Sequence, residues 1–397
     1  MKLMHMADLH IGKVLSEQSL LEDQKYMLNE IIEIALEEKV DAILICGDIY
    51  DKSIPSTEAV DLLDEFLNRV IKKHHIKVFI ISGNHDSKSR LNFGSKIFED
   101  EGLYIETNYR GTLRKIELED ADIYMLPFIK PIEVRKYFED EEIKTYEEAI
   151  KCILQRVKLN KDKKNILMAH QFVTYKDRFP ERCDSETVNV GSIDNVDAKL
   201  FFNFDYVALG HIHGPQRIGK DTIRYSGTML KYSFSEVHHN KSLIIIDTSS
   251  EELEMKSIPL KPLRDMREIR GPLSELLNPT NYVGTALEDY IFATITDEEP
   301  GYSPLTRLRS VYPNILKLEI RNSKTAATMS EICKIEKIKE KSPSKLFEEF
   351  YEYQNAVPPS EKVAKIIEGL FEELDSDTLC REKTSKEKKA SIKENHY

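Results

Sequence analysis

The chain has 397 residues, of which 41% are hydrophobic, so it is long enough to bury one large core and a smaller module. Its formal net charge of −12 disfavours a protein that binds nucleic acid through a broad basic surface, but not one that captures phosphates locally. The five cysteines include no Cys-x-x-Cys pair, no signal peptide is visible, and no apolar run approaches the roughly 18 residues of a membrane-spanning helix. We therefore expect a cytoplasmic protein of more than one domain, with reduced thiols and no contact with a membrane.

Short apolar runs alternate with helical patterns over the first half of the chain. Residues 17–39 carry apolar side chains at helical spacing, and residues 56–73 repeat that pattern with Ser56 or Thr57 as the expected N-cap. Apolar runs typical of buried strands lie at residues 2–6, 41–46, 77–82, 165–169 and 205–209. Further strand-like runs lie near Ile105 and at residues 113–118, 122–126, 223–226, 242–247 and 253–258. This alternation predicts an α/β layered fold with functional groups at the carboxyl ends of its central strands.

Each of the five buried strand-like runs leads into a short polar signature. The signatures are Asp8-Leu9-His10, Gly47-Asp48-Ile49-Tyr50-Asp51, Gly83-Asn84-His85-Asp86, His170 and Gly210-His211-Ile212-His213. Taken singly, Asp-x-His or Gly-Asp occurs in many proteins by chance or as a simple turn. Together they supply carboxylates, an amide oxygen and imidazoles, which are ligands that Mn²⁺, Fe²⁺ or Zn²⁺ accept. The complete set, in this order, predicts a hydrolase with two metal ions.

Roles for these side chains follow from the needs of a two-metal site, which uses one shared carboxylate and separate terminal ligands on each side. We expect Asp48 to bridge the two ions. The other expected ligands are Asp8, His10 and His213 for the first ion, and Asn84, His170 and His211 for the second. With a bridging hydroxide and a phosphodiester present, the two carboxylates leave the loaded site close to neutral.

Two further residues of the signatures, His85 and Asp51, suggest a catalytic pair. His85 directly follows Asn84 and cannot easily reach the same ion, so we expect it to act as a general acid or as a cationic donor to the phosphoryl group. Asp51 is expected to orient that imidazole and to raise its pKa. Three basic residues in the adjacent loops either meet phosphates or are simply solvated: Lys13, Lys88 and Arg90.

The pattern changes near Pro259, where Pro-Leu-Lys-Pro ends the last strand-like run of the first region. Strand-like runs at residues 266–269, 290–296 and 315–320 and helical runs at 273–277 and 304–312 then indicate a small α+β module. Two short amphipathic helices follow, and their faces are too apolar to stay in water, so they dock either on the chain itself or on a partner. The predicted parts are a catalytic domain at 1–260, a capping domain at 261–322, a linker at 323–343, a helical partner-binding motif at 344–375 and a disordered charged tail at 376–397.

The five signatures resemble those of the calcineurin-like metallophosphoesterases, and longer strings resemble the SbcD family of nuclease subunits within that superfamily. These strings are Ser82-Gly-Asn-His-Asp-Ser-Lys-Ser-Arg-Leu-Asn-Phe-Gly94, Tyr225-Ser-Gly-Thr-Met-Leu-Lys-Tyr-Ser-Phe-Ser-Glu236 and Pro262-Leu-Arg-Asp-Met-Arg-Glu-Ile-Arg-Gly271. The resemblance covers most of the chain. It implies an α/β/β/α layered sandwich with a small α+β capping domain and C-terminal helices. It also implies two divalent ions, expected to be Mn²⁺.

The family resemblance also implies a function. SbcD-like proteins act as homodimers, in a heterotetramer with the ABC/SMC-like ATPase SbcC, and they cleave DNA. The expected activities are ATP-stimulated 3′–5′ exonuclease action on duplex ends, endonuclease action on single strands and hairpin opening, in DNA repair, recombination and replication. A stand-alone metallophosphatase or small nucleotide phosphodiesterase is the alternative, because the signatures are shared across the superfamily, although the C-terminal helices argue against it. A catalytically silent adaptor is disfavoured because no expected ligand is lost.

Overall fold

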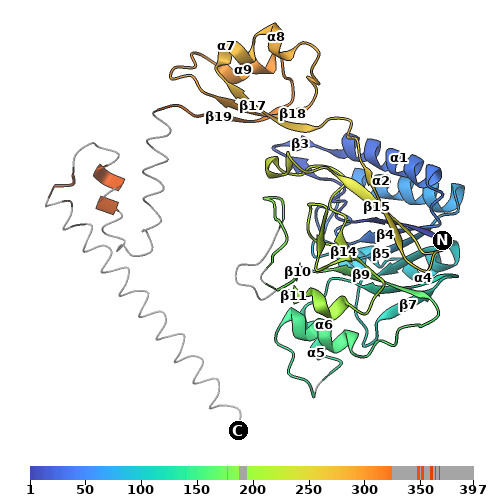
Figure 1. Cartoon of the computed structure of the whole chain (residues 1–397). Coiled ribbons are helices and arrows are strands. Elements are labelled where there is room, and N and C mark those ends of the chain that lie inside the picture. The colour runs from blue at the N-terminus through green and yellow to red at the C-terminus, as the bar shows by residue number, and fades with distance from the viewer. Residues whose placement is uncertain are drawn as a thin grey trace. The chain divides into compact units, whose positions relative to one another are not determined.

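The computed structural model describes residues 1–138, 140–176, 178–186 and 195–323, together with a few positions between 347 and 366. Residues Met1–Glu319 form one compact unit. Two six-stranded sheets make up the body of this unit, with helices on their outer faces (Figure 1).

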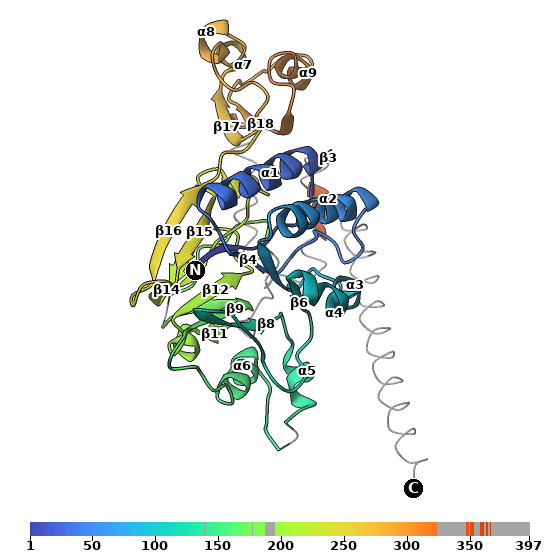
Figure 2. The ribbon, with the colours of Figure 1, turned by 90° about the vertical axis from the view of Figure 1, so that its right-hand side faces the viewer.

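The first sheet has the strand order β16-β15-β1-β4-β5-β6. Its parallel strands are β1 (Lys2–Met6), β4 (Ala42–Cys46), β5 (Lys77–Ile81) and β6 (Leu103–Glu106). Strand β15 (Ser242–Asp247) joins β1 in antiparallel fashion, and β16 (Glu254–Pro259) joins β15 in the same way. Helices α1 (Leu21–Glu37) and α2 (Thr57–Asn68) lie over the outer face of this sheet (Figure 2).

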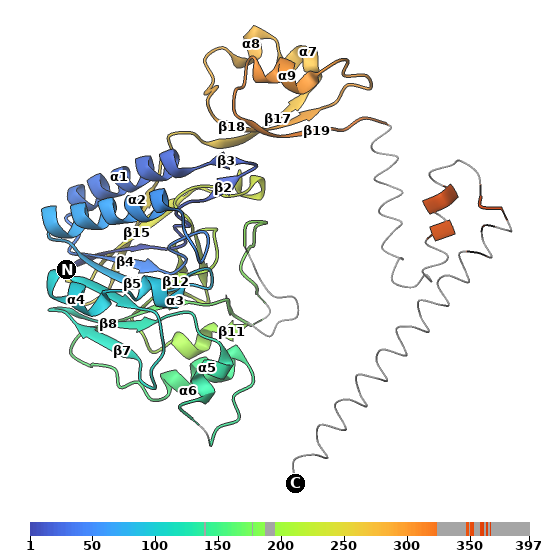
Figure 3. The same ribbon diagram turned by 180° about the vertical axis from the view of Figure 1, so that it is seen from behind.

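The second sheet has the order β13-β14-β12-β9-β8-β7. Strands β8 (Ala121–Leu126), β9 (Lys164–His170), β12 (Tyr206–Gly210) and β14 (Lys220–Tyr225) run parallel. Strands β7 (Arg114–Glu117) and β13 (Gln216–Ile218) are antiparallel edges. Helices α5 (Pro131–Arg135) and α6 (Tyr146–Leu154) lie on the side of this sheet away from α1 and α2 (Figure 3).

The two sheets pack face to face because their central strands are apolar on both sides. In β4, Ala42, Leu44 and Cys46 belong to a core shared with the second sheet, whereas Ile43 and Ile45 belong to the core under α1 and α2. Alternate residues of one strand therefore serve two cores, as the two-residue period of a strand requires. The predicted α/β/β/α sandwich is confirmed.

Two of the expected helices differ in their limits. The first begins only at Leu21, because residues 14–19 form the hairpin of β2 (Val14–Leu15) and β3 (Gln18–Ser19). The second begins after Ser56, whose Oγ accepts a hydrogen bond from the Ala59 N–H at 3.3 Å, so the predicted N-cap is confirmed. It ends at Asn68 and continues as a single π-helical turn, Arg69–Lys73.

Several short elements connect the strands. They are α3 (Lys88–Leu91), α4 (Ser95–Phe98), the strand pair β10 (Val173–Thr174) and β11 (Val196–Asp197), and the 3₁₀ turns Glu99–Glu101, Ala198–Phe201 and Phe234–Glu236. No helix in the described part of the chain is both long and apolar enough to cross a bilayer. Cys46, Cys152 and Cys183 are free and buried, and Cys333 and Cys380 lie outside the described residues.

A small module built on a three-stranded sheet follows the two six-stranded sheets along the chain. It contains β17 (Met266–Gly271), α7 (Leu273–Leu276), α8 (Pro279–Tyr282), β18 (Tyr290–Ile295), α9 (Pro304–Arg309) and β19 (Ile315–Ile320). The expected α+β module is present, with α8 in addition. The domain limits drawn from the sequence stay a prediction. The predicted linker, C-terminal helices and tail lie outside the described residues, apart from scattered helical positions such as Phe347 and Phe350.

A buried ion pair joins the start of this module to helix α1. The Arg264 guanidinium donates to both oxygens of Asp23, each at 2.9 Å, and the Tyr290 hydroxyl donates to the same carboxylate at 2.7 Å. Asp23 is only 1% exposed, so its charge depends on these donors in place of water.

We predict that Arg264→Leu lowers the free energy of unfolding by about 3 kcal/mol, because it leaves the Asp23 carboxylate buried without its cation. The exposed Arg270 of β17 provides the matched control, and Arg270→Leu should change the stability by less than about 0.5 kcal/mol. Urea unfolding of both variants measures the difference. An equal loss of unfolding free energy in the two variants would show that the Asp23 ion pair contributes no more to stability than an exposed arginine does.

Candidate metal centre and active site

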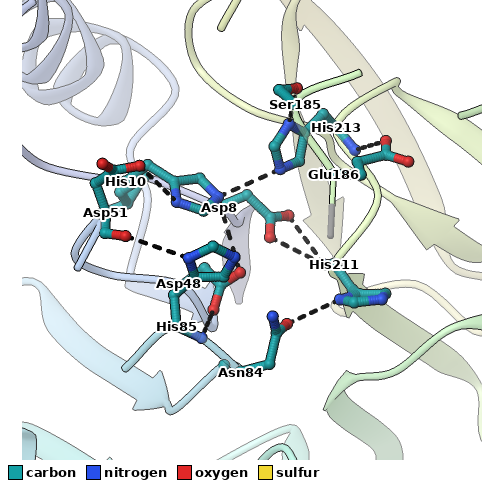
Figure 4. A network of polar contacts seen from close by, with 12 residues as sticks. Asp8, His10, Asp48, Asp51, Asn84, His85, Ser185, Glu186, His211 and His213 are labelled. Carbon is teal, nitrogen blue, oxygen red and sulfur yellow. Dashed lines mark hydrogen bonds and ion pairs between the residues drawn. The ribbon is translucent and has the colours of Figure 1, made fainter. Parts of the chain in front are cut away.

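The five polar signatures follow strands whose carboxyl ends point the same way. In the first sheet β1, β4 and β5 are parallel, and they lead into Asp8, Asp48 and Asn84. In the second sheet β9 and β12 are parallel, and they end at His170 and directly before His211. Because the sheets pack face to face, both sets of side chains meet at one edge of the sandwich (Figure 4).

Left-handed backbone turns aim these side chains into the site. Asp8, His10 and Asp48 have φ values of 54°, 44° and 49°, and His211 has a φ of 99°. Each such conformation costs on the order of 1–3 kcal/mol for a residue other than glycine. Main-chain hydrogen bonds hold the turns, from Asp8 N–H to the Gly47 carbonyl at 3.0 Å and from His10 N–H to the Asp48 carbonyl at 2.9 Å. The surrounding structure thus maintains a strained backbone where the chemistry is placed.

Two glycines permit the close approach of the loops. An added Cβ at Gly83 would lie 2.0 Å from the Asp48 Oδ1, and one at Gly210 would lie 1.8 Å from the Cys46 carbonyl oxygen. Neither distance is compatible with a side chain. The glycines of these signatures therefore let the backbone of one strand end lie directly against the site residues of another.

Three predicted ligands of the first ion lie together. Single ligand atoms from Asp8, His10 and His213 all fall within 4.8 Å of one another. The Nε2 atoms of His10 and His213 are 3.2 Å apart. The Asp8 carboxylate also accepts the His211 main-chain N–H, at 3.0 and 3.1 Å to its two oxygens. This contact ties the Asp8 turn in the first sheet to the histidine-rich turn after β12.

Three predicted ligands of the second ion form another group. The Asn84 Oδ1 lies 3.0 Å from the His170 Nε2 and 2.9 Å from the His211 Nδ1. The His170 Nδ1 faces the Cys46 carbonyl oxygen at 2.8 Å and donates to it, which leaves the Nε2 to face the site. His211 thus presents its Nδ1 to the site, whereas His213 presents its Nε2.

The predicted bridging carboxylate lies between the two groups. The Asp48 Oδ2 is 3.7 Å from the His10 Nε2 and 3.4 Å from the His170 Nε2, and its Oδ1 accepts the His85 main-chain N–H at 2.9 Å. One oxygen atom is therefore close to a member of each ligand group. This is the arrangement that a bridging ligand needs, and the assignment of ligands to ions stays a prediction.

Burial fixes the protonation of the site. It lowers the pKa of His10 to about 4 and of His211 to about 3, and it lowers the pKa of His213 well below its usual value. Burial also opposes the charge on His170, but the neighbouring Asp48 raises the pKa of that imidazole to about 9. Three imidazoles are therefore neutral at physiological pH, which is the form of histidine that binds metals.

The donor set as a whole fits divalent cations. Three neutral imidazoles, the His170 ring, an amide oxygen and two carboxylates converge at this place. Burial raises the pKa of Asp8 well above its usual value, and the His170 imidazole, whose Nδ1 lies 3.9 Å from the Asp8 Oδ1, offsets only part of that effect. Cations at this place would satisfy the lone pairs and the buried carboxylates together.

The proposed catalytic pair is arranged differently from the prediction. The His85 Nδ1 faces the main-chain carbonyl oxygen of Asp51 at 3.2 Å, while the Asp51 carboxylate accepts a hydrogen bond from the Lys13 Nζ at 2.8 Å. The expectation that the Asp51 carboxylate orients His85 is therefore wrong. The carbonyl still selects a tautomer, because only a protonated Nδ1 can donate to it. Asp51 thus orients His85 through its backbone.

The predicted phosphate-binding residues are mostly engaged within the protein. Besides the Lys13 ion pair with Asp51, the Lys88 ammonium pairs with Glu133 at 2.6 Å, and Arg90 is exposed on α3. Of the three, Arg90 alone has no ion pair within the described residues. It is the most available of these groups for a phosphate.

One carboxylate without a predicted role, Asp86, holds the backbone of two signatures together. Asp86 accepts main-chain N–H groups from Gly83 at 2.8 Å, from Ile49 at 3.1 Å and from Tyr50 at 3.2 Å. It thereby ties the third signature to the second. Its position as the last residue of Gly-Asn-His-Asp was the available signal. Ser185, Glu186 and Glu236 lie beside His213, and no role was predicted for them. Glu236 ends the family-like string Tyr225 to Glu236, but nothing local to the sequence pairs it with Ser185.

Comparisons with known proteins agree with this site. Residues 1–215 match the family described as Calcineurin-like phosphoesterase, and residues 262–355 match the Type 5 capsule protein repressor C-terminal domain. The chain is similar to the D subunit of the nuclease SbcCD from Staphylococcus epidermidis, with 37% identity over 88% of this chain and 92% of the relative. It is 33% identical to the protein of the same name from Staphylococcus saprophyticus, over 94% of this chain and 99% of the relative. A crystallised dimetal phosphatase from Danio rerio aligns at 12% identity and a TM-score of 0.36, over 66% of this chain and 97% of its own, which is too distant to carry an argument.

We predict that Gly83→Ala lowers the stability by about 1–3 kcal/mol and abolishes Mn²⁺ binding, because its Cβ would displace the Asp48 carboxylate. Gly214→Ala is the matched control, since its Cβ would meet only side-chain atoms, of His239 at 3.1 Å and of Gln216 at 3.6 Å, which can move aside. Thermal unfolding with and without Mn²⁺ measures both effects. Undiminished Mn²⁺ stabilisation of Gly83→Ala would contradict the placement of Asp48 at the centre of the site.

Proposed function

Because this chain belongs to the calcineurin-like phosphoesterases and, within them, to the SbcD family, we propose that it is the metal-dependent nuclease subunit of an SbcCD-type complex. Its reaction is the hydrolysis of DNA phosphodiester bonds, with exonuclease action on ends, endonuclease action on single strands and opening of hairpins. The observation that carries this proposal is the convergence of six ligand-type side chains around Asp48, whose Oδ2 lies 3.7 Å from the His10 Nε2 and 3.4 Å from the His170 Nε2.

The site residues support this chemistry with the roles expected from the sequence. When bound, two divalent cations, which we propose to be Mn²⁺, would supply Lewis acidity and a hydroxide nucleophile. Asp48 is proposed as the shared ligand. The terminal ligands are proposed to be Asp8, His10 and His213 on one side and Asn84, His170 and His211 on the other. We propose that a residue outside these two ligand groups transfers the proton to the departing oxygen.

His85 is the proposed general acid. Its main-chain N–H donates to Asp48 at 2.9 Å and its Nδ1–H to the Asp51 carbonyl at 3.2 Å, so the backbone and one ring nitrogen are both held. The ring meets His10 edge-on, with the centroids 5.0 Å apart. In the imidazolium form the free Nε2–H would be the atom that delivers a proton to the departing oxygen. Asp51 contributes by orienting this ring.

We predict that His85→Ala lowers the rate of hairpin DNA cleavage with Mn²⁺ by roughly 10²–10⁴-fold, while Mn²⁺ binding persists. The exposed His238 is the matched control, and His238→Ala should cleave at the wild-type rate. The assay uses a labelled hairpin with and without an SbcC-type ATPase and ATP, which we expect to stimulate cleavage. Hydrolysis of small phosphodiesters without DNA cleavage under any condition would instead favour a stand-alone phosphodiesterase.

Family membership supports a proposal about the partners. We propose that the chain acts in the cytoplasm as a homodimer, within a heterotetramer with an SbcC-type ABC/SMC-like ATPase, in DNA repair, recombination and replication. The C-terminal helical motif is proposed to bind that ATPase. Five exposed apolar side chains mark a candidate dimer surface: Val60, Phe93 and Phe98, which line one hollow, together with Ile54 and Ile97. Phe93 is 85% exposed and Ile97 is 76% exposed, which is unusual for neighbouring large apolar side chains of a monomer.

We predict that the double variant Phe93→Glu/Ile97→Glu is monomeric at micromolar concentrations at which the wild-type chain is a dimer. Tyr302→Glu is the matched control, because Tyr302 is 92% exposed but lies in the three-stranded module. Analytical ultracentrifugation gives the mass of each. A dimeric double variant would place the interface elsewhere.

A further inference from the structure

A buried hydrogen-bonded chain lies on the far side of the His213 ring from His10. The His213 Nδ1 is 2.6 Å from the Ser185 Oγ, and this hydroxyl is 2.6 Å from the Glu236 Oε1. Glu236 is 0% exposed and His213 is 2% exposed, so water does not compete for these contacts. Figure 4 shows Ser185 and Glu186 on this side of His213.

The partners of Glu236 set the direction of these hydrogen bonds. Its Oε2 accepts from the Lys241 ammonium at 2.6 Å, and this buried ion pair keeps the carboxylate ionised. An ionised carboxylate only accepts hydrogen bonds, so the Ser185 hydroxyl must donate to it. The Ser185 Oγ then accepts the remaining proton, the Nδ1–H of His213. The neutral ring is left with its lone pair on Nε2, the atom 3.2 Å from the His10 Nε2.

The main chain of His213 is held by the same surroundings. The Lys241 ammonium donates to the His213 carbonyl at 2.9 Å and to the Thr228 Oγ1 at 2.7 Å. The Glu186 Oε1 accepts the His213 N–H at 2.8 Å. Both the ring and the backbone of this one residue are thus fixed by side chains that the proposed reaction does not otherwise use.

We propose that Ser185 and Glu236 are positioning residues that fix the tautomer and ring orientation of His213 for metal binding, a role that rests on the proposed function. Carboxylates that support a metal-binding histidine commonly act in this way, and their loss weakens metal binding about 10–100-fold. In this chain a serine hydroxyl is inserted between the ring and the carboxylate. The His211 ring faces Asn84 with its Nδ1 and packs edge-on against Phe172, with the ring centroids 6.3 Å apart. The effect should therefore be confined to one of the two ions.

The test compares two serines that both hydrogen-bond to the Glu236 Oε1. Ser185 hydrogen-bonds to His213, whereas Ser233 donates to Glu236 at 3.0 Å and, among the hydrogen bonds of the described residues, makes none to His213. Calorimetric titration of the full-length chain with Mn²⁺ gives the affinity of each site. We expect Ser185→Ala to weaken one of the two sites about 10–100-fold and to spare the other, and Ser233→Ala to leave both unchanged.

A second measurement needs no variant. Nitrogen-15 NMR of the histidine rings in the wild-type protein loaded with Zn²⁺, in place of paramagnetic Mn²⁺, reports which ring nitrogen of His213 carries the proton. We expect the proton on Nδ1. A proton on Nε2 overturns the proposal, and so does equal Mn²⁺ binding by Ser185→Ala and Ser233→Ala when the wild-type chain binds two ions and cleaves DNA. If the wild-type chain binds no Mn²⁺, the proposed function fails as well.

Discussion

The contact of one Asp48 oxygen with imidazoles from both sheets is the interaction on which the rest of the site depends. His10 follows a strand of the first sheet and His170 ends a strand of the second, yet their Nε2 atoms lie 3.7 Å and 3.4 Å from the same Oδ2. These two distances require the parallel strands of both sheets to have their carboxyl ends on the same side of the sandwich. They also require Gly83, because any side chain there would overlap the Asp48 carboxylate.

The site is costly for the folded chain, and the costs are offset nearby. Asp8, His10, Asp48 and His211 all adopt left-handed backbone conformations, and Asp8 and Asp48 are buried carboxylates. Main-chain bonds between the Asp8 and Asp48 turns, and the three N–H donors around Asp86, hold these conformations. The lone pairs of several ligand atoms also face one another in the site, and bound cations would relieve the repulsion between them. Binding energy would then contribute to stability as well as to catalysis.

Sequence reasoning could group the candidate ligands because the pattern that marks them is local. A polar residue directly after a buried parallel strand must lie at the sheet edge, so the residue pattern alone is enough to place Asp8, Asp48 and His170. The role of Asp51 was misjudged because proximity along the chain does not reveal whether a carboxylate or a carbonyl faces the ring. Ser185 and Glu236 escaped notice because they are 51 positions apart and are brought together only by tertiary packing.

The central claim is that Asp48 bridges two metal ions, and anomalous diffraction from crystals grown with Mn²⁺ tests it most directly. We expect two anomalous peaks roughly 3.5–4 Å apart, with Asp48 between them. One peak should contact His10 and His213, and the other should contact Asn84, His170 and His211. A single peak, or two peaks that do not share Asp48, would contradict the account.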